Sequence, residues 1–278
     1  MNELTKSPED RAHPLPHSDE DAARARQIPD TPQTRSPSYQ LAFTDRDFLL
    51  REELRPIRLQ LELLKPQMLL DEAGVESTVV MFGGARIPSP DKAGGARTQM
   101  LGALSVYYEQ ARLFAQEMTR RSLETGGREF VICTGGGPGV MEAGNLGAAE
   151  VGGKSIGLGI VLPHEQAPNI HVTPELAFNF HYFAIRKMHF LMRARAITVF
   201  PGGFGTLDEM FEALTLIQTG RMARLPFLLF GAEFWEGIIN WKGLAEAGTI
   251  SDEDLGLLHF VETAEEAVRI IDGWPKPA

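Results

Sequence analysis

The sequence has little of several residue types, and each shortage argues against a class of protein. Only one of its 278 residues is cysteine, Cys133, so neither an intrachain disulfide nor a zinc site with several cysteines can form. Its 27 lysines and arginines are outnumbered by 37 acidic residues, and this net charge of −10 disfavours a nucleic-acid partner, which needs a basic surface. No apolar run approaches the roughly 20 residues that span a bilayer, so we expect no membrane partner.

Two further absences concern location and metals. The first residues lack the apolar core of a secretory signal peptide, and we therefore expect a cytoplasmic location. The seven histidines show no metal-ligand spacing such as H-E-x-x-H, so we expect no metal site.

Glycine is absent from the first 73 residues and frequent afterwards, which indicates where the compact domain begins. Residues 1–38 are rich in proline and charge and have almost no large apolar side chains, so we predict a disordered tail. Residues 39–74 are predicted to form an N-terminal helical extension, and residues 75–278 the main domain. Within the extension, one apolar stripe at helical spacing predicts a face buried on the main domain, with a dimer contact or lid as the alternative. That stripe consists of Ile57, Leu61, Leu64 and Met68.

From residue 75 onward, short β-rich runs alternate with amphipathic helical segments. We predict strands over residues 78–82, 130–133, 155–160, 196–200 and 227–230, and a closing helix over 264–271. Strands that are apolar throughout and alternate with helices indicate an α/β fold with a parallel sheet covered on both faces. Ligands of such folds bind outside the carboxyl ends of the strands.

Three strand-to-helix junctions are rich in glycine. They span residues 82–86, 134–142 and 201–209, and the latter two open a helix. Glycine lets the backbone approach a ligand closely, and a helix N-terminus favours an anion, so we expect a phosphate or nucleotide site rather than plain turns. None of the junctions has the dinucleotide-binding spacing or the Lys-Ser/Thr ending of a nucleoside-triphosphate loop. A nicotinamide dehydrogenase and an ATPase are therefore disfavoured.

The charged residues near these junctions can each be interpreted in two ways, as structural or as functional. Asp208 and Glu209 fall in the first turn of a helix, where acidic residues complement the helix dipole, but Glu209 is the better functional candidate. Arg186 and Lys187 interrupt an apolar helical run, either on its solvated face or as a cationic pair at a phosphate–sugar site. Sequence pattern alone leaves both readings of the basic pair open.

Taken together, these motifs resemble the LOG family of cytokinin riboside 5′-monophosphate phosphoribohydrolases, many of which carried an early lysine decarboxylase label. The resemblance rests on residues 135–139, on Arg186-Lys187 and on residues 201–206 followed by Glu209, and it covers roughly residues 75–250. It implies a Rossmann-like, doubly wound parallel sheet with helices on both faces, and a homodimer. The long N-terminal region is similar to that of a bacterial branch, because members of the short plant type lack it.

The resemblance also implies roles for individual residues. Arg186 and Glu209 match the catalytic arginine and glutamate, and Lys187 accompanies Arg186 in binding. The positions that match substrate-binding residues are Gly135, Gly136, Gly137, Glu165 and Thr215, together with the phosphate loop of Gly202, Gly203, Phe204, Gly205 and Thr206. Glu142 departs from the plant-type pattern, and it either alters base preference or only complements a helix dipole.

The expected activity is hydrolysis of the N-glycosidic bond of a nucleoside 5′-monophosphate, AMP or a cytokinin riboside 5′-monophosphate, to free base and ribose 5-phosphate. A carboxylate such as that of Glu209 suits the oxocarbenium-like transition state, and Arg186 suits the leaving base through its charge. A pyridoxal-phosphate decarboxylase would need Lys187, which already has a binding role, so we expect no cofactor. The alternative from another class is a carrier that binds a nucleotide or molybdenum cofactor without hydrolysing it.

Overall fold

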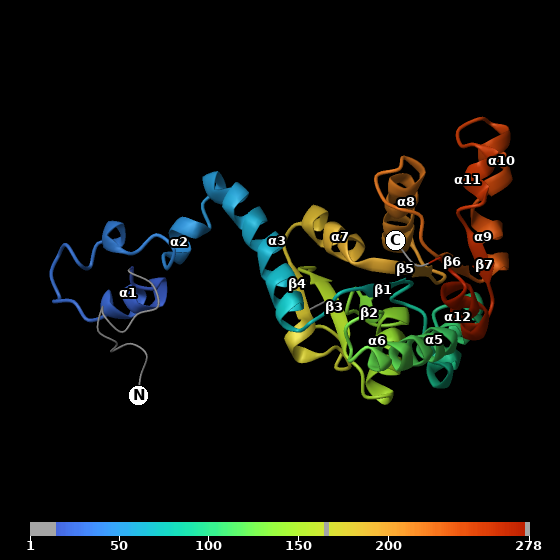
Figure 1. Cartoon of the computed structure of the whole chain (residues 1–278), viewed down its shortest axis with the longest axis horizontal. Coiled ribbons are helices and arrows are strands. Elements are labelled where there is room, and N and C mark those ends of the chain that lie inside the picture. The colour runs from blue at the N-terminus through green and yellow to red at the C-terminus, as the bar shows by residue number, and fades with distance from the viewer. Residues whose placement is uncertain (1–14, 164–166, 276–278) are drawn as a thin grey trace. The chain divides into compact units, whose positions relative to one another are not determined.

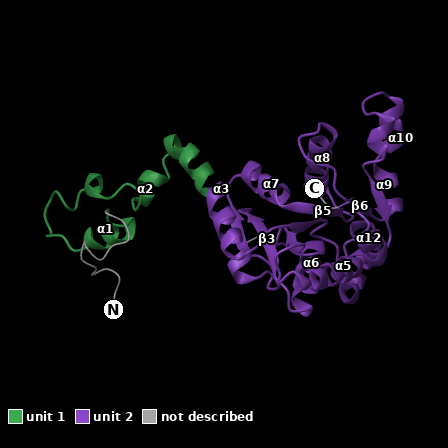
Figure 2. Cartoon of the chain, viewed as in Figure 1, with its two compact units in different colours: residues 1–61 green, residues 62–278 purple. Residues whose placement is uncertain are grey.

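The computed structural model describes residues 15–163 and 167–275 and divides the chain into two compact units, residues 1–61 and 62–278 (Figure 2). The division falls inside one continuous helix, α3 (Arg55–Glu72). The domain boundary predicted after residue 74 lies just beyond the end of this helix and stays a prediction.

Between residue 15, where the described part of the first unit begins, and the start of α3, the chain forms only short helical elements. These are α1 (Ser18–Arg24), η3 (Pro37–Tyr39), α2 (Arg46–Leu49) and η4 (Glu52–Leu54). None of the four contains a buried residue, so they have no apolar core of their own. Part of the predicted tail, residues 1–14, lies outside the described residues, and the disorder predicted for residues 1–38 stays a prediction.

The predicted buried face of α3 was wrong. The four side chains of the apolar stripe are between 42% and 56% exposed, and the buried residues of the helix are Pro66 and Leu70. Leu70 joins the apolar core of the second unit, and Lys154 Nζ donates to Ala73 O just past the helix at 2.8 Å. Helical spacing shows that residues share a face of a helix, but it does not show what covers that face.

The second unit is built on a seven-stranded sheet in which every pair of neighbours is parallel (Figure 1). Its order is β4-β3-β2-β1-β5-β6-β7. The strands are β1 (Thr78–Phe82), β2 (Val131–Thr134), β3 (Ser155–Ile160), β4 (Ala177–Phe180), β5 (Ala194–Val199), β6 (Phe227–Phe230) and β7 (His259–Val261). The five predicted strands are confirmed, whereas β4 and β7 at the two edges were not predicted.

Helices cover both faces of this sheet, as the Rossmann-like prediction requires. The helices described after α3 are α4 (Gln99–Ala103), α5 (Ser105–Glu124), α6 (Val140–Glu150), α7 (Phe183–Met192), α8 (Phe204–Gln218), α9 (Ala232–Ile238), α10 (Trp241–Glu246), α11 (Asp252–Leu255) and α12 (Ala264–Asp272), with the 3-10 turns η5 (Pro90–Gly95) and η6 (Pro174–Leu176). Because strand side chains alternate, Val79 and Met81 pack with α5, α6 and α12, while Val80 and Phe82 pack with α7, α8 and α9. The predicted closing helix is confirmed as α12.

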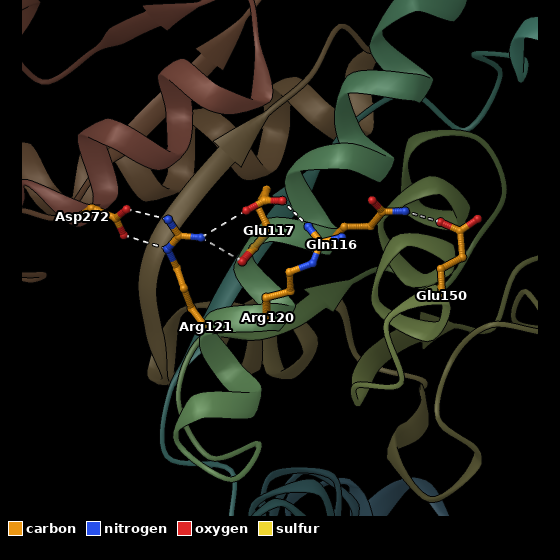
Figure 3. A network of polar contacts seen from close by, with 6 residues as sticks. All are labelled: Gln116, Glu117, Arg120, Arg121, Glu150 and Asp272. Atoms are coloured by element: carbon orange, nitrogen blue, oxygen red, sulfur yellow. Dashed lines mark hydrogen bonds and ion pairs between the residues drawn. The ribbon is translucent and has the colours of Figure 1, made fainter.

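Polar contacts tie α5 to both neighbouring helices of its layer (Figure 3). Gln116 donates to Glu150 on α6 at 2.6 Å, and Arg121 binds Asp272 at the end of α12 through two nitrogens, at 2.8 and 2.6 Å. Arg120 pairs with Glu117 one turn away. Exposed pairs of this kind each contribute little, so the layer is held mainly by the apolar residues beneath them.

The strand order also creates a switch point. The chain runs outward from β1 to β4 and then returns to place β5 on the other side of β1 (Figure 1). The loops after β1 and β5 therefore diverge and leave a crevice at the carboxyl edge, where ligands of this fold class bind. Within the described residues, no helix has both the length and the apolar character needed to cross a membrane.

Candidate active site

A cleft of about 770 Å³ opens at the carboxyl ends of β1 and β5. Its walls are residues 83–87 after β1, residues 201–203 after β5 and the first turns of α8, with α7 side chains between them. This volume falls within the range typical of small-molecule sites. The two loops are joined directly, because the Gly84 N–H donates to Pro201 O at 2.9 Å.

Glycines permit the close approach of these loops. A Cβ on Gly83 would lie 2.5 Å from the Val140 side chain, and one on Gly202 would lie 2.1 Å from Thr206 Oγ1. A Cβ on Gly203 or on Gly205 would meet open space, so no contact within the chain requires glycine at these two positions. Their open surroundings leave room for a ligand at the N-terminus of α8, where the first backbone N–H groups have no intrahelical acceptor.

The phosphate loop predicted after β5 lies in the cleft. All five of its residues, from Gly202 to Thr206, line the cavity. The Thr206 side chain is buried against Gly202, whereas Phe204 is 91% exposed at the mouth. The loop thus has a fixed polar end and an exposed aromatic end.

Two residues of the second glycine-rich junction line the cleft, Gly135 and Met141. Gly135 lines the cleft, and a Cβ there would lie 2.8 Å from Arg186 Nη2. The carbonyls of Gly136 and Gly137 turn instead to Asn169, whose Nδ2 donates to them at 3.1 and 3.0 Å. The junction therefore makes room for the Arg186 side chain, and the binding roles of Gly136 and Gly137 stay predictions.

The second glycine-rich junction is held in place by the buried side-chain amide of Asn145, which the sequence analysis did not predict. Asn145 on α6 accepts hydrogen bonds from Thr134 Oγ1 at 2.8 Å and Asn169 Nδ2 at 2.9 Å, and donates to Ser155 Oγ at 2.9 Å. Its only signal in the sequence is a lone amide within a helix of small and apolar residues. Asn145 is fully buried and links β2, β3 and α6 behind the cleft.

We expect Asn145→Ala to lower the free energy of unfolding by about 2 to 3 kcal/mol, because it removes three side-chain hydrogen bonds from a buried network and leaves a cavity. Urea denaturation followed by circular dichroism measures the change. Gln116→Ala is the matched control, since it removes an exposed amide with one hydrogen bond and should cost about 0.5 kcal/mol or less. Equal losses in both variants would contradict the structural role of Asn145.

Arg186 reaches into the cleft from α7. Its Nε donates to Leu158 O at the end of β3 at 2.7 Å, and its guanidinium lies over the Phe190 ring, 5.1 Å from the centroid. Nη1 is 3.9 Å from Glu209 Oε1. The sequence left open whether this arginine lies on a solvated face, and its side chain is in fact only 13% exposed.

Glu209 lines the opposite wall from the second turn of α8, and its side chain is 10% exposed. Burial in this wall raises the pKa of the Glu209 carboxyl to about 7, against the lowering effect of Lys187 and Arg186. The group therefore changes its protonation state near neutral pH. A carboxyl tuned in this way suits general acid–base chemistry, and its position beside a guanidinium in a cleft marks a functional site.

Lys187 does not line the cleft, although it follows Arg186 directly. Its ammonium group pairs with Asp208 and Glu212 on α8 at 2.8 Å each and lies 3.9 Å from Glu209 Oε2. These carboxylates raise the pKa of Lys187 in opposition to burial, which is the largest single influence. The two neighbouring cations thus have separate roles, one in the cleft and one between α7 and α8.

Two other predicted residues lie apart from the cleft or outside the structure. Thr215 is about two turns further along α8 and does not line the cleft; its hydroxyl donates to Phe211 O at 2.7 Å in a groove that shares Phe204, Leu207 and Asp208 with the cleft. Glu165 lies outside the described residues, and its assignment stays a prediction. Glu142 does not belong to the cleft lining, which contains its neighbour Met141.

The fold and the cleft define the class: a Rossmann-like α/β protein with its ligand site at the topological switch point. Residues 141–271 match a family model described as "possible lysine decarboxylase". The sequence is 39% identical over 75 residues to the bifunctional cytokinin biosynthesis protein of Fusarium pseudograminearum, covering 27% of this chain and 15% of that protein. It is 32% identical over 85 residues to the cytokinin riboside 5′-monophosphate phosphoribohydrolase of Mycobacterium tuberculosis, covering 30% of this chain and 46% of the relative.

Among solved structures, the molybdenum cofactor binding protein of Rippkaea orientalis is 18% identical, with a TM-score of 0.48, over 71% of this chain and 96% of that one. The alignments with the two curated relatives span less than half of either relative's length. The family match and the two cytokinin-related sequences agree with the resemblance to the LOG family that the motifs indicated.

Proposed function

We propose that this chain hydrolyses the N-glycosidic bond of a nucleoside 5′-monophosphate, AMP or a cytokinin riboside 5′-monophosphate, to free base and ribose 5-phosphate. The observation that carries the proposal is the buried Glu209 carboxyl, with a pKa of about 7, facing Arg186 in the cleft. The name of the mycobacterial relative agrees with this activity.

In the proposed reaction the bond between C1′ and the base nitrogen breaks as positive charge develops on the ribose ring. Ionised Glu209 stabilises this oxocarbenium-like charge and accepts a proton from the water whose oxygen bonds to C1′. Arg186 stabilises the negative charge on the departing base, which leaves with the bonding electron pair and then takes up a proton. Arginine is a poor proton donor, so its contribution is electrostatic.

The residues that line the cleft also argue against a lysine decarboxylase, the activity named in the description of the matching family model. A pyridoxal-phosphate decarboxylase needs a lysine that can form a Schiff base beside its substrate. Among the described residues that line the cleft there is no lysine, and the Lys187 ammonium group is held by Asp208 and Glu212. These residues do not fit that cofactor.

The test is incubation of the purified full chain with AMP and with isopentenyladenosine monophosphate, followed by chromatography of the free bases. We expect base release from at least one nucleotide and release about 10³-fold slower from the Glu209→Gln variant. Binding of the nucleotides by calorimetry without any release would overturn the hydrolase proposal and favour a carrier. Release at similar rates by the wild type and the variant would overturn the role of Glu209.

The family resemblance extends the proposal to a homodimer. Several large apolar side chains of the second unit are exposed in the single chain, among them Leu64, Met68, Met188 and Met192. Exposed apolar surface of this kind is typical of a protein interface. Size-exclusion chromatography with light scattering distinguishes a dimer from a monomer directly.

A further inference from the structure

Arg86 lines the cleft from the loop that follows β1, and no role has yet been given to it. The loop turns sharply here, with the Ile87 N–H donating to Gly84 O at 3.4 Å. Ile87 is 3% exposed and anchors the turn in the core, whereas the neighbouring Arg86 is exposed. The guanidinium of Arg86 is thus carried at the rim of the cavity by a turn whose backbone is held in place by the buried side chain of Ile87.

The charges of the cleft are few. Of the described residues that line it, Arg86 and Arg186 are positive, and Asp208 and Glu209 are negative. Arg186 is occupied beside Glu209 and at Leu158 O, which places it at the reacting end of the cleft. Within the described part of the chain, no hydrogen bond or ion pair is found for the Arg86 side chain.

Both the loop that carries Arg86 and the N-terminus of α8 line the cleft. The Gly84 N–H···Pro201 O bond joins the two loops, and a Cβ on Gly202 would lie 3.0 Å from Gly84 N. The loop carrying Arg86 therefore runs directly beside the loop that opens α8. A guanidinium and the free N–H groups of a helix N-terminus are complementary donors for a phosphate monoester.

We propose that Arg86 binds the 5′-phosphate of the substrate together with the first turn of α8. This inference rests on the proposed function and deepens it, because it assigns the phosphate to Arg86 and the start of α8, and the glycosidic bond to Arg186 and Glu209. Arg86 takes the binding role that the sequence had assigned to Lys187, whose ammonium group is engaged with α8. The site then selects a nucleotide over the corresponding nucleoside, which has no phosphate to bind.

The experiment compares Arg86→Gln with Arg97→Gln. Arg97 is an exposed arginine shortly before α4 and does not line the cleft, so its variant controls for the loss of one positive charge. For Arg86→Gln we expect kcat/KM for the nucleotide that the wild type cleaves to fall by about 30- to 100-fold, mainly through KM. Cleavage of the corresponding nucleoside should change less than about threefold, and Arg86→Lys should recover part of the loss.

A direct binding measurement separates this inference from the proposed function. Calorimetry with ribose 5-phosphate should show binding to the wild type and to Arg97→Gln, and binding at least about tenfold weaker to Arg86→Gln. Equal binding by all three proteins, or an unchanged preference for nucleotide over nucleoside in Arg86→Gln, would overturn the role of Arg86 while base release still supported the hydrolase. Absence of base release from the wild type would overturn the hydrolase, and the ribose 5-phosphate measurement would still decide whether Arg86 binds phosphate.

Discussion

Glu209→Gln should lower kcat by about 10³-fold while the nucleotide still binds within about tenfold of its wild-type affinity. The amide keeps the shape of the side chain but can neither accept a proton nor carry the negative charge that stabilises the ribose. Glu236→Gln is the control, because Glu236 is an exposed glutamate of α9 that does not line the cleft. Rapid-quench and calorimetric measurements on both variants separate turnover from binding, and a Glu209→Gln variant that turns over normally would contradict the assignment.

The pH dependence of the wild type follows from the same group. Since the pKa of Glu209 is about 7 and the ionised form is the active one, kcat/KM should rise with pH up to about 7 and flatten above it. The free energy of unfolding changes with pH in the direction opposite to that of kcat/KM. Between its ordinary value of 4.5 and about 7 the folded protein holds a proton that the unfolded chain has lost, so the free energy of unfolding falls as pH rises.

A consequence is that Glu209→Gln should be more stable than the wild type at pH 8, by up to about 3 kcal/mol, and should show no such advantage at pH 4.5. Thermal denaturation across this range measures the difference. The Glu236→Gln control should follow the wild-type curve at every pH. A Glu209→Gln variant that is less stable at pH 8 would show that burial does not raise the pKa as described.

Gly139→Ala should lower the free energy of unfolding by at least about 3 kcal/mol and greatly reduce base release. Gly139 precedes α6 with φ of +69°, a conformation that strains any other residue. A Cβ there would also lie 2.4 Å from Gly84 O and 2.8 Å from the Ala85 carbonyl, which are backbone atoms with no room to move aside. The collision would push out the loop that joins β1 to the cleft.

Gly152→Ala separates the effect of backbone strain from the effect of the steric clash. Gly152 has φ of +78°, but nothing lies within 4 Å of the position that its Cβ would take. This variant carries the backbone strain alone and should cost about 1 to 2 kcal/mol with activity retained. Urea denaturation and the base-release assay on both proteins provide the comparison, and similar effects of the two substitutions would refute the packing argument.

The central strands could be predicted because they are buried on both faces and therefore apolar throughout. The edge strands could not be predicted for the opposite reason. In β4 exposed and buried residues alternate, with Ala177 and Asn179 exposed, and β7 has only three residues, from His259 to Val261. Neither presents the continuous apolar run that identified the others.

Some residues of the candidate site could likewise be predicted from the sequence, and others could not. Glycine-rich junctions are visible in a sequence because glycine satisfies a local backbone requirement, and the loop after β5 indeed lines the cleft. Adjacent charged residues are harder to assign, because a rotation of about 100° per residue along a helix sends Arg186 and Lys187 in different directions. Which of the two faces the cleft depends on how α7 packs against the sheet, and this is a tertiary property.

The contacts of Lys187 have a consequence for catalysis. Its two short ion pairs join α7 to α8, and these are the helices that carry Arg186 and Glu209 (Figure 1). The distance between the guanidinium and the carboxyl is therefore set when the chain folds, before any substrate arrives. In the proposed hydrolysis, a site that is preorganised in this way would need little rearrangement of its dipoles as charge develops at C1′, which would lower the reorganisation energy of the reaction.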